Sequence, residues 1–226
     1  MLATALLAPR LLLAQGITFG GKTTFGGPFS AGGAAASGAS LSGSYTTSTS
    51  AVNITTTGST DWIHWGGTSS SNTCNGVNRK SGGGSQISDY TVNGSGGNNA
   101  YPNDARAISW TDGTPTASDT NQTGCYTLGQ SGSSFTFTLP ASTAAHTAIL
   151  YLGGFNMTAG QLKLTAHLAD GSAADYTDTT CGVGGGTFDC NYTLTYKAGS
   201  STTLNVTWGA TAATAGNMTV EGVAYQ

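Results

Sequence analysis

Charged side chains are scarce in this sequence. Only 8% of the 226 residues are charged, with 7 basic against 10 acidic side chains. The net charge of −3 therefore comes from scattered charges, and no basic stripe is present that could neutralise the phosphates of a nucleic acid. Nucleic acid is not an expected partner. The dominant residues are Gly, Ser, Thr and Ala, a polar mixture of low charge that is typical of secreted surface proteins.

The chain also has few of the acidic residues that a common glycosidase needs. Its single glutamate is Glu221, whereas most glycosidases place two carboxylates across the sugar. Aspartates such as Asp89 and Asp112 have sufficient local roles at turns and strand ends. No Gly-x-Ser-x-Gly elbow occurs in an α/β setting. The sequence therefore predicts that the protein is not an enzyme.

Histidines are equally few, and they are dispersed. His64, His146 and His167 form no H-x-H or H-E-x-x-H pair, so no metal site and no cofactor are expected. A calcium site would have to be assembled from separate loops, because no D-x-D-x-D-G ladder is present. His64 lies between two tryptophans and is interpreted first as a packed core-edge residue, with a functional imidazole as the alternative.

The four cysteines fit an oxidising compartment, in which paired cysteines persist. Four cysteines allow three pairings. Cys181 and Cys190 bracket a glycine-rich loop that a disulfide could close, which leaves Cys74 for Cys125. A metal site is a weaker interpretation, since no C-x-x-C spacing occurs and no histidine lies near a cysteine in sequence.

The N-terminal residues indicate export. Residues 1–15 hold an apolar run that is interrupted by Pro9 and Arg10 and is too short to span a bilayer, so a signal peptide is expected and a transmembrane segment is not. The usual basic residues before the run are missing, which suggests that the true start lies further upstream.

Residues 16–44 combine an apolar arm with a tether. The arm carries Thr-Phe-Gly-Gly twice, and even spacing places Ile17, Phe19 and Phe25 on one face of an extended segment. Residues 30–44 are nearly all Gly, Ala, Ser and Leu, as in a flexible tether. An arm of this kind could dock on its own domain or on a neighbouring copy, and strand addition of the second kind builds head-to-tail fibres.

From residue 45 to residue 226, short alternating runs are separated by turn residues at the spacing of a β-sandwich. Alternation such as Phe135, Phe137 and Leu139 against threonines puts apolar side chains on a core face. No window shows a helical period. The predicted fold is one all-β domain, an antiparallel two-sheet sandwich of jelly-roll type. The expected strands are 51–56, 61–65, 85–92, 106–111, 125–128, 134–139, 147–153, 161–168, 173–178, 191–196, 202–208 and 217–224.

Three of the four tryptophans lie between residues 61 and 115. On a strand, Trp62 and His64 share one face while Ile63 and Trp65 share the other, so only one of the two rings is expected in the core. A partly exposed Trp62, together with His64, Arg79 and Trp110, could form a glycan-binding platform. The alternative is that Trp62 packs under a loop and Arg79 stacks on it or pairs with Asp61.

Several longer strings resemble a family of secreted bacterial β-sandwich modules of unknown activity. They are D-W-I-H-W-G, N-R-K, I-S-D-Y-T-V, A-I-S-W-T-D-G-T-P-T-A-S, L-T-A-H-L-A-D-G-S-A-A-D-Y-T-D and Y-T-L-T-Y-K-A, and they cover about 52–224. The resemblance implies export and a sandwich; it supplies neither a ligand nor catalytic residues. Cys74, the Cys181–Cys190 loop and the arm are not part of that pattern.

The sequence thus predicts a secreted, non-catalytic β-sandwich with a structural or adhesive role at the cell surface or in extracellular fibres. Ile17, Phe19 and Phe25 are its expected docking residues, and copies of itself are its expected partner. The alternative is a carbohydrate-binding module that recognises surface glycans through the tryptophan region.

Overall fold

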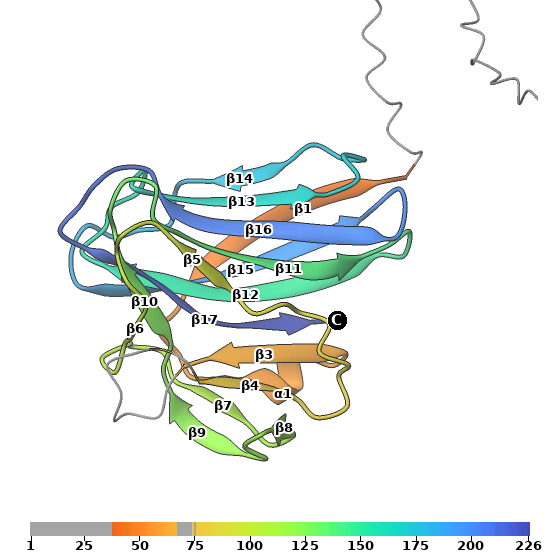
Figure 1. The fold of residues 1–226 in the computed structure, drawn as a ribbon, viewed down its shortest axis with the longest axis horizontal. Helices are drawn as coiled ribbons and strands as arrows, with labels where there is room; N and C mark the ends of the chain where they lie inside the picture. Colours follow the sequence, from red (N-terminus) through yellow and green to blue (C-terminus); the bar gives the residue numbers. More distant parts are fainter. Residues whose placement is uncertain (1–37, 67–73, 75) are drawn as a thin grey trace, which may run out of the picture. The chain divides into compact units, whose positions relative to one another are not determined.

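The computed structural model describes residues 38–66, 74 and 76–226, and most of these residues are in β-strands. The larger sheet has the order β1 (Ser40–Thr47), β15 (Thr187–Lys197), β12 (His146–Phe155), β17 (Asn217–Tyr225), β3 (Asp61–Trp65), β4 (Val77–Lys80) and β8 (Gly113–Thr114), with β10 (Cys125–Leu128) beside β17 and β6 (Asn99–Ala100) beside β10. The second sheet has the order β14 (Tyr176–Asp178), β13 (Leu162–Leu168), β16 (Thr202–Ala210), β11 (Ser134–Ala141) and β5 (Thr91–Asn93). A small third sheet contains β2 (Val52–Asn53), β7 (Ile108–Trp110) and β9 (Asp119–Gln122), and the one-turn helix α1 spans Ile54–Thr57 (Figure 1).

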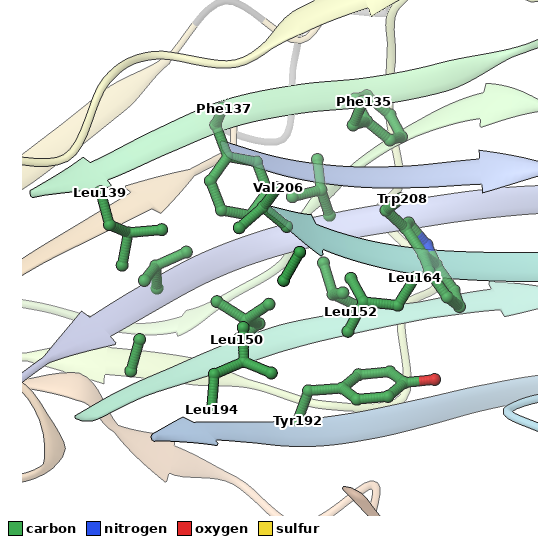
Figure 2. Close-up of a cluster of buried hydrophobic side chains, with 14 of the residues drawn as sticks. Phe135, Phe137, Leu139, Leu150, Leu152, Leu164, Tyr192, Leu194, Val206 and Trp208 are labelled. Carbon is green, nitrogen blue, oxygen red and sulfur yellow. The ribbon is translucent and has the colours of Figure 1, made fainter. Parts of the chain in front are cut away.

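The larger sheet and the second sheet pack face to face around one apolar core. Period-two alternation sends Phe135, Phe137 and Leu139 of β11 inward, and all three are buried while the residues between them are half-buried. Figure 2 shows how these side chains meet those of the opposite sheet. The labelled members are Phe135, Phe137, Leu139, Leu150, Leu152, Leu164, Tyr192, Leu194, Val206 and Trp208. Each such side chain contributes about 1.5–3 kcal/mol on burial, so this layer is the main source of stability.

The central part of the larger sheet, in β12, β17 and β3, is also covered on its other face. There, α1 and β7 bring Ile54, Ile108 and Trp110 against Trp62, Tyr151 and Ala224 in a second buried cluster. Strand β17 consequently has buried residues at every position after Asn217. A strand buried on both sides shows no alternation in its burial, although its side chains still alternate between the two faces.

A β-bulge in β17 changes which of its side chains face the main core. Tyr151 pairs with Gly222 and Leu152 pairs with Val220, so Glu221 is the extra residue without a partner in β12. Before the bulge Met218 and Val220 belong to the main core, and after it Val223 and Tyr225 do. The bulge therefore keeps four apolar side chains in the sandwich and turns Glu221 toward the second face.

Most of the predicted strands are present, and the all-β, antiparallel prediction is confirmed. The parallel pair β2 and β7 is an exception. The strand predicted at 85–92 is wrong before Thr91, where β5 begins. The strand predicted at 51–56 is wrong beyond Asn53, where the Asn53 side chain accepts a hydrogen bond from the Thr55 backbone and begins α1. The strand predicted at 134–139 extends to Ala141 and so includes Pro140, which is possible because β5 pairs only with Ser134–Thr136 of that strand. The jelly-roll path stays a prediction.

The chain enters the larger sheet earlier than the sequence indicated. Residues 40–44, the last part of the predicted tether, are in β1, where Leu41 and Tyr45 pack against the main core. The strand was not predicted because small residues give it the composition of a tether. Packing requires one of them: a Cβ at Gly43 would lie 2.7 Å from the Leu194 side chain and 2.8 Å from the Tyr176 ring.

Two disulfides connect the cysteines as the loop argument predicted. Cys74 is bonded to Cys125 and Cys181 to Cys190, across sequence separations of 51 and 9. Their presence indicates an oxidising environment. Within the described ranges no helix is long and apolar enough to cross a membrane.

The two disulfides should contribute unequally to stability. Because the entropic contribution grows with the length of the closed loop, replacing Cys74 and Cys125 by alanine should lower the free energy of unfolding by about 4 kcal/mol, against about 3 kcal/mol for Cys181 and Cys190. Urea unfolding of the two double variants measures both. A larger loss for the Cys181 and Cys190 variant would contradict the loop-length account.

Candidate functional site

Three of the four residues predicted to bind glycans lie together, and all three are buried. The rings of Trp62 and Trp110 have centroids 5.7 Å apart, and the His64 ring lies 5.0 Å from that of Trp110. Each is at most 1% exposed. Trp62 and His64 do share one face of β3, as predicted, but that face is the covered second face of the larger sheet. The partial exposure expected for Trp62 is therefore not found, and these rings offer no open face for a sugar to stack on.

Arg79 lies on the opposite side of this strand pair. It is paired with Ile63 in the ladder, and directly opposed residues point to the same face, so Arg79 projects away from Trp62 and His64. Its guanidinium donates to the Ile87 carbonyl at 2.5 Å and to Asp89 Oδ1 at 2.7 Å. It does not form the pair with Asp61 that the sequence suggested as an alternative.

Asp112 connects the tryptophan cluster to its surroundings. Its carboxylate accepts hydrogen bonds from Trp62 Nε1 at 2.9 Å, Thr55 Oγ1 at 2.5 Å and Lys80 Nζ at 2.5 Å. Partial burial opposes ionisation, but the bonds from Lys80, Thr55 and Trp62 outweigh it and lower the pKa of Asp112. Asp112 is thus a structural acceptor that joins α1, β3 and β4, and it is not poised to donate a proton.

His64 is the most perturbed member of the cluster. Neither of its ring nitrogens has a hydrogen-bond partner within the part of the chain that the structure describes. Burial lowers the pKa of His64 to about 4, and the Thr123 backbone and the charge of Asp119 oppose this shift only in part. His64 is therefore neutral at physiological pH, as expected for a packed residue.

A second group of polar residues lies on the same covered face of the larger sheet. Asp189 projects from β15 and Glu221 from the bulge of β17, and the loop after β6 places Asp104 and Arg106 over them. One oxygen atom from each of the three carboxylates lies within 4.8 Å of the other two. We refer to Asp104, Asp189 and Glu221 as the acidic triad.

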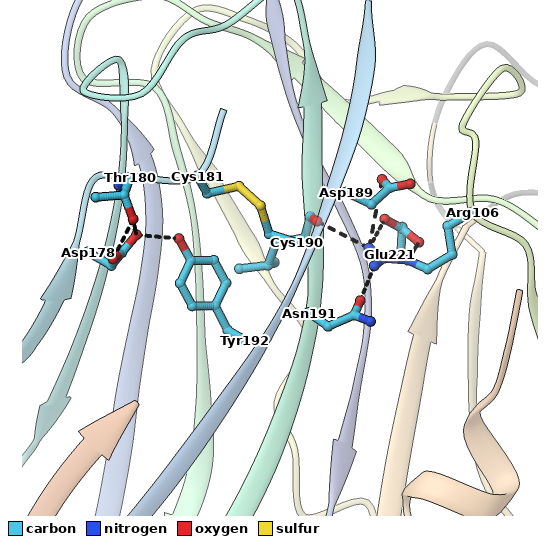
Figure 3. Close-up of a disulfide and its surroundings, with 10 residues drawn as sticks. Arg106, Asp178, Thr180, Cys181, Asp189, Cys190, Asn191, Tyr192 and Glu221 are labelled. Carbon is cyan, nitrogen blue, oxygen red and sulfur yellow. Dashed lines mark hydrogen bonds and ion pairs between the residues drawn. A yellow bond between two sulfur atoms is a disulfide. The ribbon is translucent and has the colours of Figure 1, made fainter. Parts of the chain in front are cut away.

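Arg106 is the counter-charge of the acidic triad (Figure 3). It is fully buried and holds Glu221 through two hydrogen bonds, from Nε at 2.6 Å and from Nη2 at 2.5 Å. It also donates to Asn191 Oδ1 and, at 3.1 Å, to the Leu152 carbonyl. Its guanidinium lies 5.2 Å from the centre of the Tyr151 ring. These contacts fix Arg106 against three neighbouring strands.

Asp104 and Asp189 have fewer hydrogen-bond partners than Glu221. Among the described residues neither carboxylate of Asp104 or Asp189 has a hydrogen-bond partner, and the four oxygens are buried. Arg106 Nη2 approaches Asp189 Oδ1 only to 3.8 Å. Burial, together with the neighbouring Glu221 and Asp189 charges, raises the pKa of Asp104 to about 10. Burial likewise raises the pKa of Asp189 and brings that of Glu221 to about 7, although Arg106 opposes both shifts.

Sequence reasoning did not identify this acidic triad. Its members come from three distant segments, and only the fold brings them together. One signal was available: Glu221, the single glutamate, stands in a strand of otherwise apolar residues, and a charge buried in such a place needs a partner. The predicted docking residues Ile17, Phe19 and Phe25 lie outside the described residues.

Lowering the pH should destabilise the protein through His64. The pKa of His64 is about 4 in the folded protein, below the 6.5 of an ordinary histidine. Between pH 6.5 and pH 4, His64 is therefore protonated in the unfolded chain but not in the folded chain. From pH 7 to pH 5, the wild type should lose about 2 kcal/mol more stability than a His64→Gln variant. Chemical denaturation at both pH values measures this difference. The matched variant His167→Gln, at an exposed position, should behave like the wild type, and equal losses in all three proteins would contradict the account.

Removing Arg106 should be far more harmful than removing an exposed charge. Arg106→Met leaves the buried Glu221 without its partner and should cost about 3–5 kcal/mol in the free energy of unfolding. Asp175→Asn, which breaks the half-exposed pair with His167, should cost less than about 1 kcal/mol. Urea unfolding at neutral pH compares the two. A loss below about 1 kcal/mol for Arg106→Met would show that the buried charge is dispensable.

Comparisons with known proteins add little to this geometry. No family model matches the chain, and no curated protein sequence matches it. A solved structure similar to part of it is the enzymatically active domain of tailspike protein 4 from bacteriophage CBA120, with a TM-score of 0.37 and 12% identity. The similarity covers 62% of this chain and 19% of the tailspike chain. At that TM-score and identity, the likeness says nothing about activity.

Proposed function

We propose that this chain is a secreted, non-catalytic β-sandwich with a structural or adhesive role at the cell surface or in extracellular fibres. In this proposal the apolar arm around Ile17, Phe19 and Phe25 docks on another copy by adding a strand to its sheet. The two disulfides support export to an oxidising environment. The resemblance to secreted bacterial sandwich modules and the jelly-roll path belong to the same proposal.

The observation that supports docking is the open edge of β1. This strand follows the arm and tether directly and stands last in the order of the larger sheet, so it pairs along eight positions with β15 and with no second strand among the described residues. Ser48 donates its backbone N–H to the Asp189 carbonyl at 3.1 Å, which places alternate residues in hydrogen-bonded pairs with β15. The backbone groups of Leu41, Gly43 and Tyr45 therefore point away from β15.

Strand β1 also lacks the features that usually protect a sheet edge. Its sequence, SLSGSYTT, contains no lysine, no proline and no inward-pointing charge. The arm from Ile17 to Phe25 would measure about 30 Å when extended, and β1 has a similar length. An extended arm could therefore cover this edge, with Ile17, Phe19 and Phe25 on one face.

Carbohydrate binding stays a prediction. Because Trp62, His64 and Trp110 are buried, another surface would have to supply the stacking ring for a sugar. Truncating Trp62 is also not a clean test of sugar binding, since removal of a buried tryptophan costs about 3–5 kcal/mol of stability.

The role of the arm is tested by its removal. The full chain should form oligomers or filaments, seen by light scattering and electron microscopy, whereas a chain without residues 16–29 should be a folded monomer, because the docking strand is absent. In a variant with Phe19→Ser and Phe25→Ser, the dissociation constant for assembly should rise at least about tenfold, because the burial of both aromatic rings is lost.

The matched control changes the other face of the same arm. A variant with Thr18→Ser and Thr24→Ser should assemble like the wild type, because even-numbered positions do not share the face of Phe19 and Phe25. Assembly that is undiminished by the deletion would rule out the arm as the docking segment. A wild type that stays monomeric would rule out assembly between copies.

A further inference from the structure

We propose that Asp104, Asp189 and Glu221 bind one divalent cation, and that calcium is the ion that fits them. The site lies between the larger sheet and the loop that carries Asp104 and Arg106, on the covered face where Figure 3 shows Asp189, Glu221 and Arg106 together. This inference does not depend on the docking arm.

The spacing of the oxygens suits a shared ion. Calcium binds oxygen ligands at about 2.3–2.6 Å, so two ligands on opposite sides of the ion are about 5 Å apart and adjacent ligands are closer. In the acidic triad one oxygen from each carboxylate lies within 4.8 Å of the other two. One oxygen of each carboxylate is therefore close enough to share an ion with the other two, and the Glu221 oxygen would do so while it also accepts a hydrogen bond from Arg106.

Asp189 points to a ligand independently of this spacing. Its side chain is 0% exposed, neither of its oxygens has a hydrogen-bond donor within the described ranges, and its ion pair with Arg106 is long, at 3.8 Å. A carboxylate that is removed from water normally acquires donors or a metal ion. Arg106, the nearest cation, directs its short hydrogen bonds to Glu221, Asn191 and Leu152 instead.

Two residues beside Asp189 favour a bound ion: Gly153 leaves space, and Thr219 offers a neutral oxygen. Gly153 pairs with Asp189 on one side and with Thr219 on the other. A Cβ at Gly153 would lie 2.6 Å from Asp189 Oδ1 and 2.9 Å from Thr219 Oγ1, so only glycine leaves this position free. Thr219 is 0% exposed, and its hydroxyl has no hydrogen-bond partner in the described part of the chain. It is a suitable additional ligand.

The balance of charge indicates a divalent ion. A bound cation would hold all three carboxylates in the ionised form, and against the one guanidinium they would then carry two net negative charges in a buried place. A cation of charge +2 neutralises them.

The type of ligand and the burial select calcium among the common divalent ions. The ligands are all oxygens, which disfavours zinc and other ions that prefer nitrogen or sulfur. Magnesium keeps several of its waters in a rigid octahedron, whereas calcium accepts six to eight oxygens in a flexible arrangement. A buried site with carboxylates from three segments suits the second behaviour.

Calcium at this site would connect the loop of Asp104 to β15 and β17. The Asp104 residue is only partly buried and its neighbours Pro102, Asn103 and Ala105 are exposed, so this loop forms the outer wall of the site. Calcium would then act as a clamp that closes the loop over the larger sheet. Sites in extracellular modules commonly have dissociation constants of about 10⁻⁴–10⁻³ M.

Calcium titration of the full chain after EDTA treatment tests the proposal. Calorimetry at constant pH should detect one calcium ion per chain. Calcium at a hundredfold excess over its Kd should raise the Tm by about 5–10 °C, because it binds only the folded state. The same concentration of magnesium should raise the Tm by less than half as much. An unchanged Tm with calcium, or an equal rise with magnesium, would overturn the assignment.

Two variants locate the ion. Asp104→Asn keeps the shape of the loop residue and mimics a protonated carboxyl, so it should fold with a Tm near that of the calcium-free wild type and lose most of the calcium-dependent rise. Thr219→Val should weaken calcium binding several-fold. The control Asp175→Asn removes a half-exposed carboxylate that pairs with His167 of the second sheet, and it should keep the full rise. A full rise in Asp104→Asn would show that calcium binds elsewhere and would refute this site.

Discussion

The structure depends on the burial of β12, β17 and β3, at the centre of the larger sheet, on both of their faces. Strands β12, β15 and β17 pack against the second sheet on one side, through residues such as Leu150 and Leu194. On the other side α1 and β7 seal the tryptophan cluster over Tyr151 and Ala224. A chain with few large side chains gains most from such a sheet, because each central strand then removes apolar surface from water twice.

Burial of both faces also explains the unusual polar groups. Side chains alternate between the two faces of β15 and β17, so some polar side chains lie on the second face. Asp189 and Glu221 are among them. Arg106 satisfies Glu221 with two hydrogen bonds, while Asp189 and Asp104 have no donor among the described residues. Asp104 and Asp189 therefore lack the partners that buried carboxyl groups normally have, which is why the acidic triad and not the tryptophan cluster is the chemically distinctive place in the fold.

The main core could be predicted from the sequence because its signal is local. Alternation along β11 or β16 shows which residues point inward, and β10 was located to the residue. The second layer could not be predicted, since the burial of Trp62 depends on Trp110 and Ile108, which are far away in the chain. The bulge at Glu221 could not be predicted either, because it arises from the pairing of β17 with β12 and no residue pattern within β17 indicates it. The disulfide pairing was predictable because a short glycine-rich loop separates Cys181 from Cys190.

The covered second face can be tested most directly through its tryptophans. Trp62 and Trp110 lie in that layer and Trp65 and Trp208 in the main core, and all four are at most 1% exposed. Acrylamide quenching of fluorescence in the wild type and in Trp62→Phe measures their access to solvent. The account predicts that all four rings are shielded, with similarly weak quenching in both proteins. A readily quenched fraction in the wild type that disappears in Trp62→Phe would show that the second face is open and would contradict it.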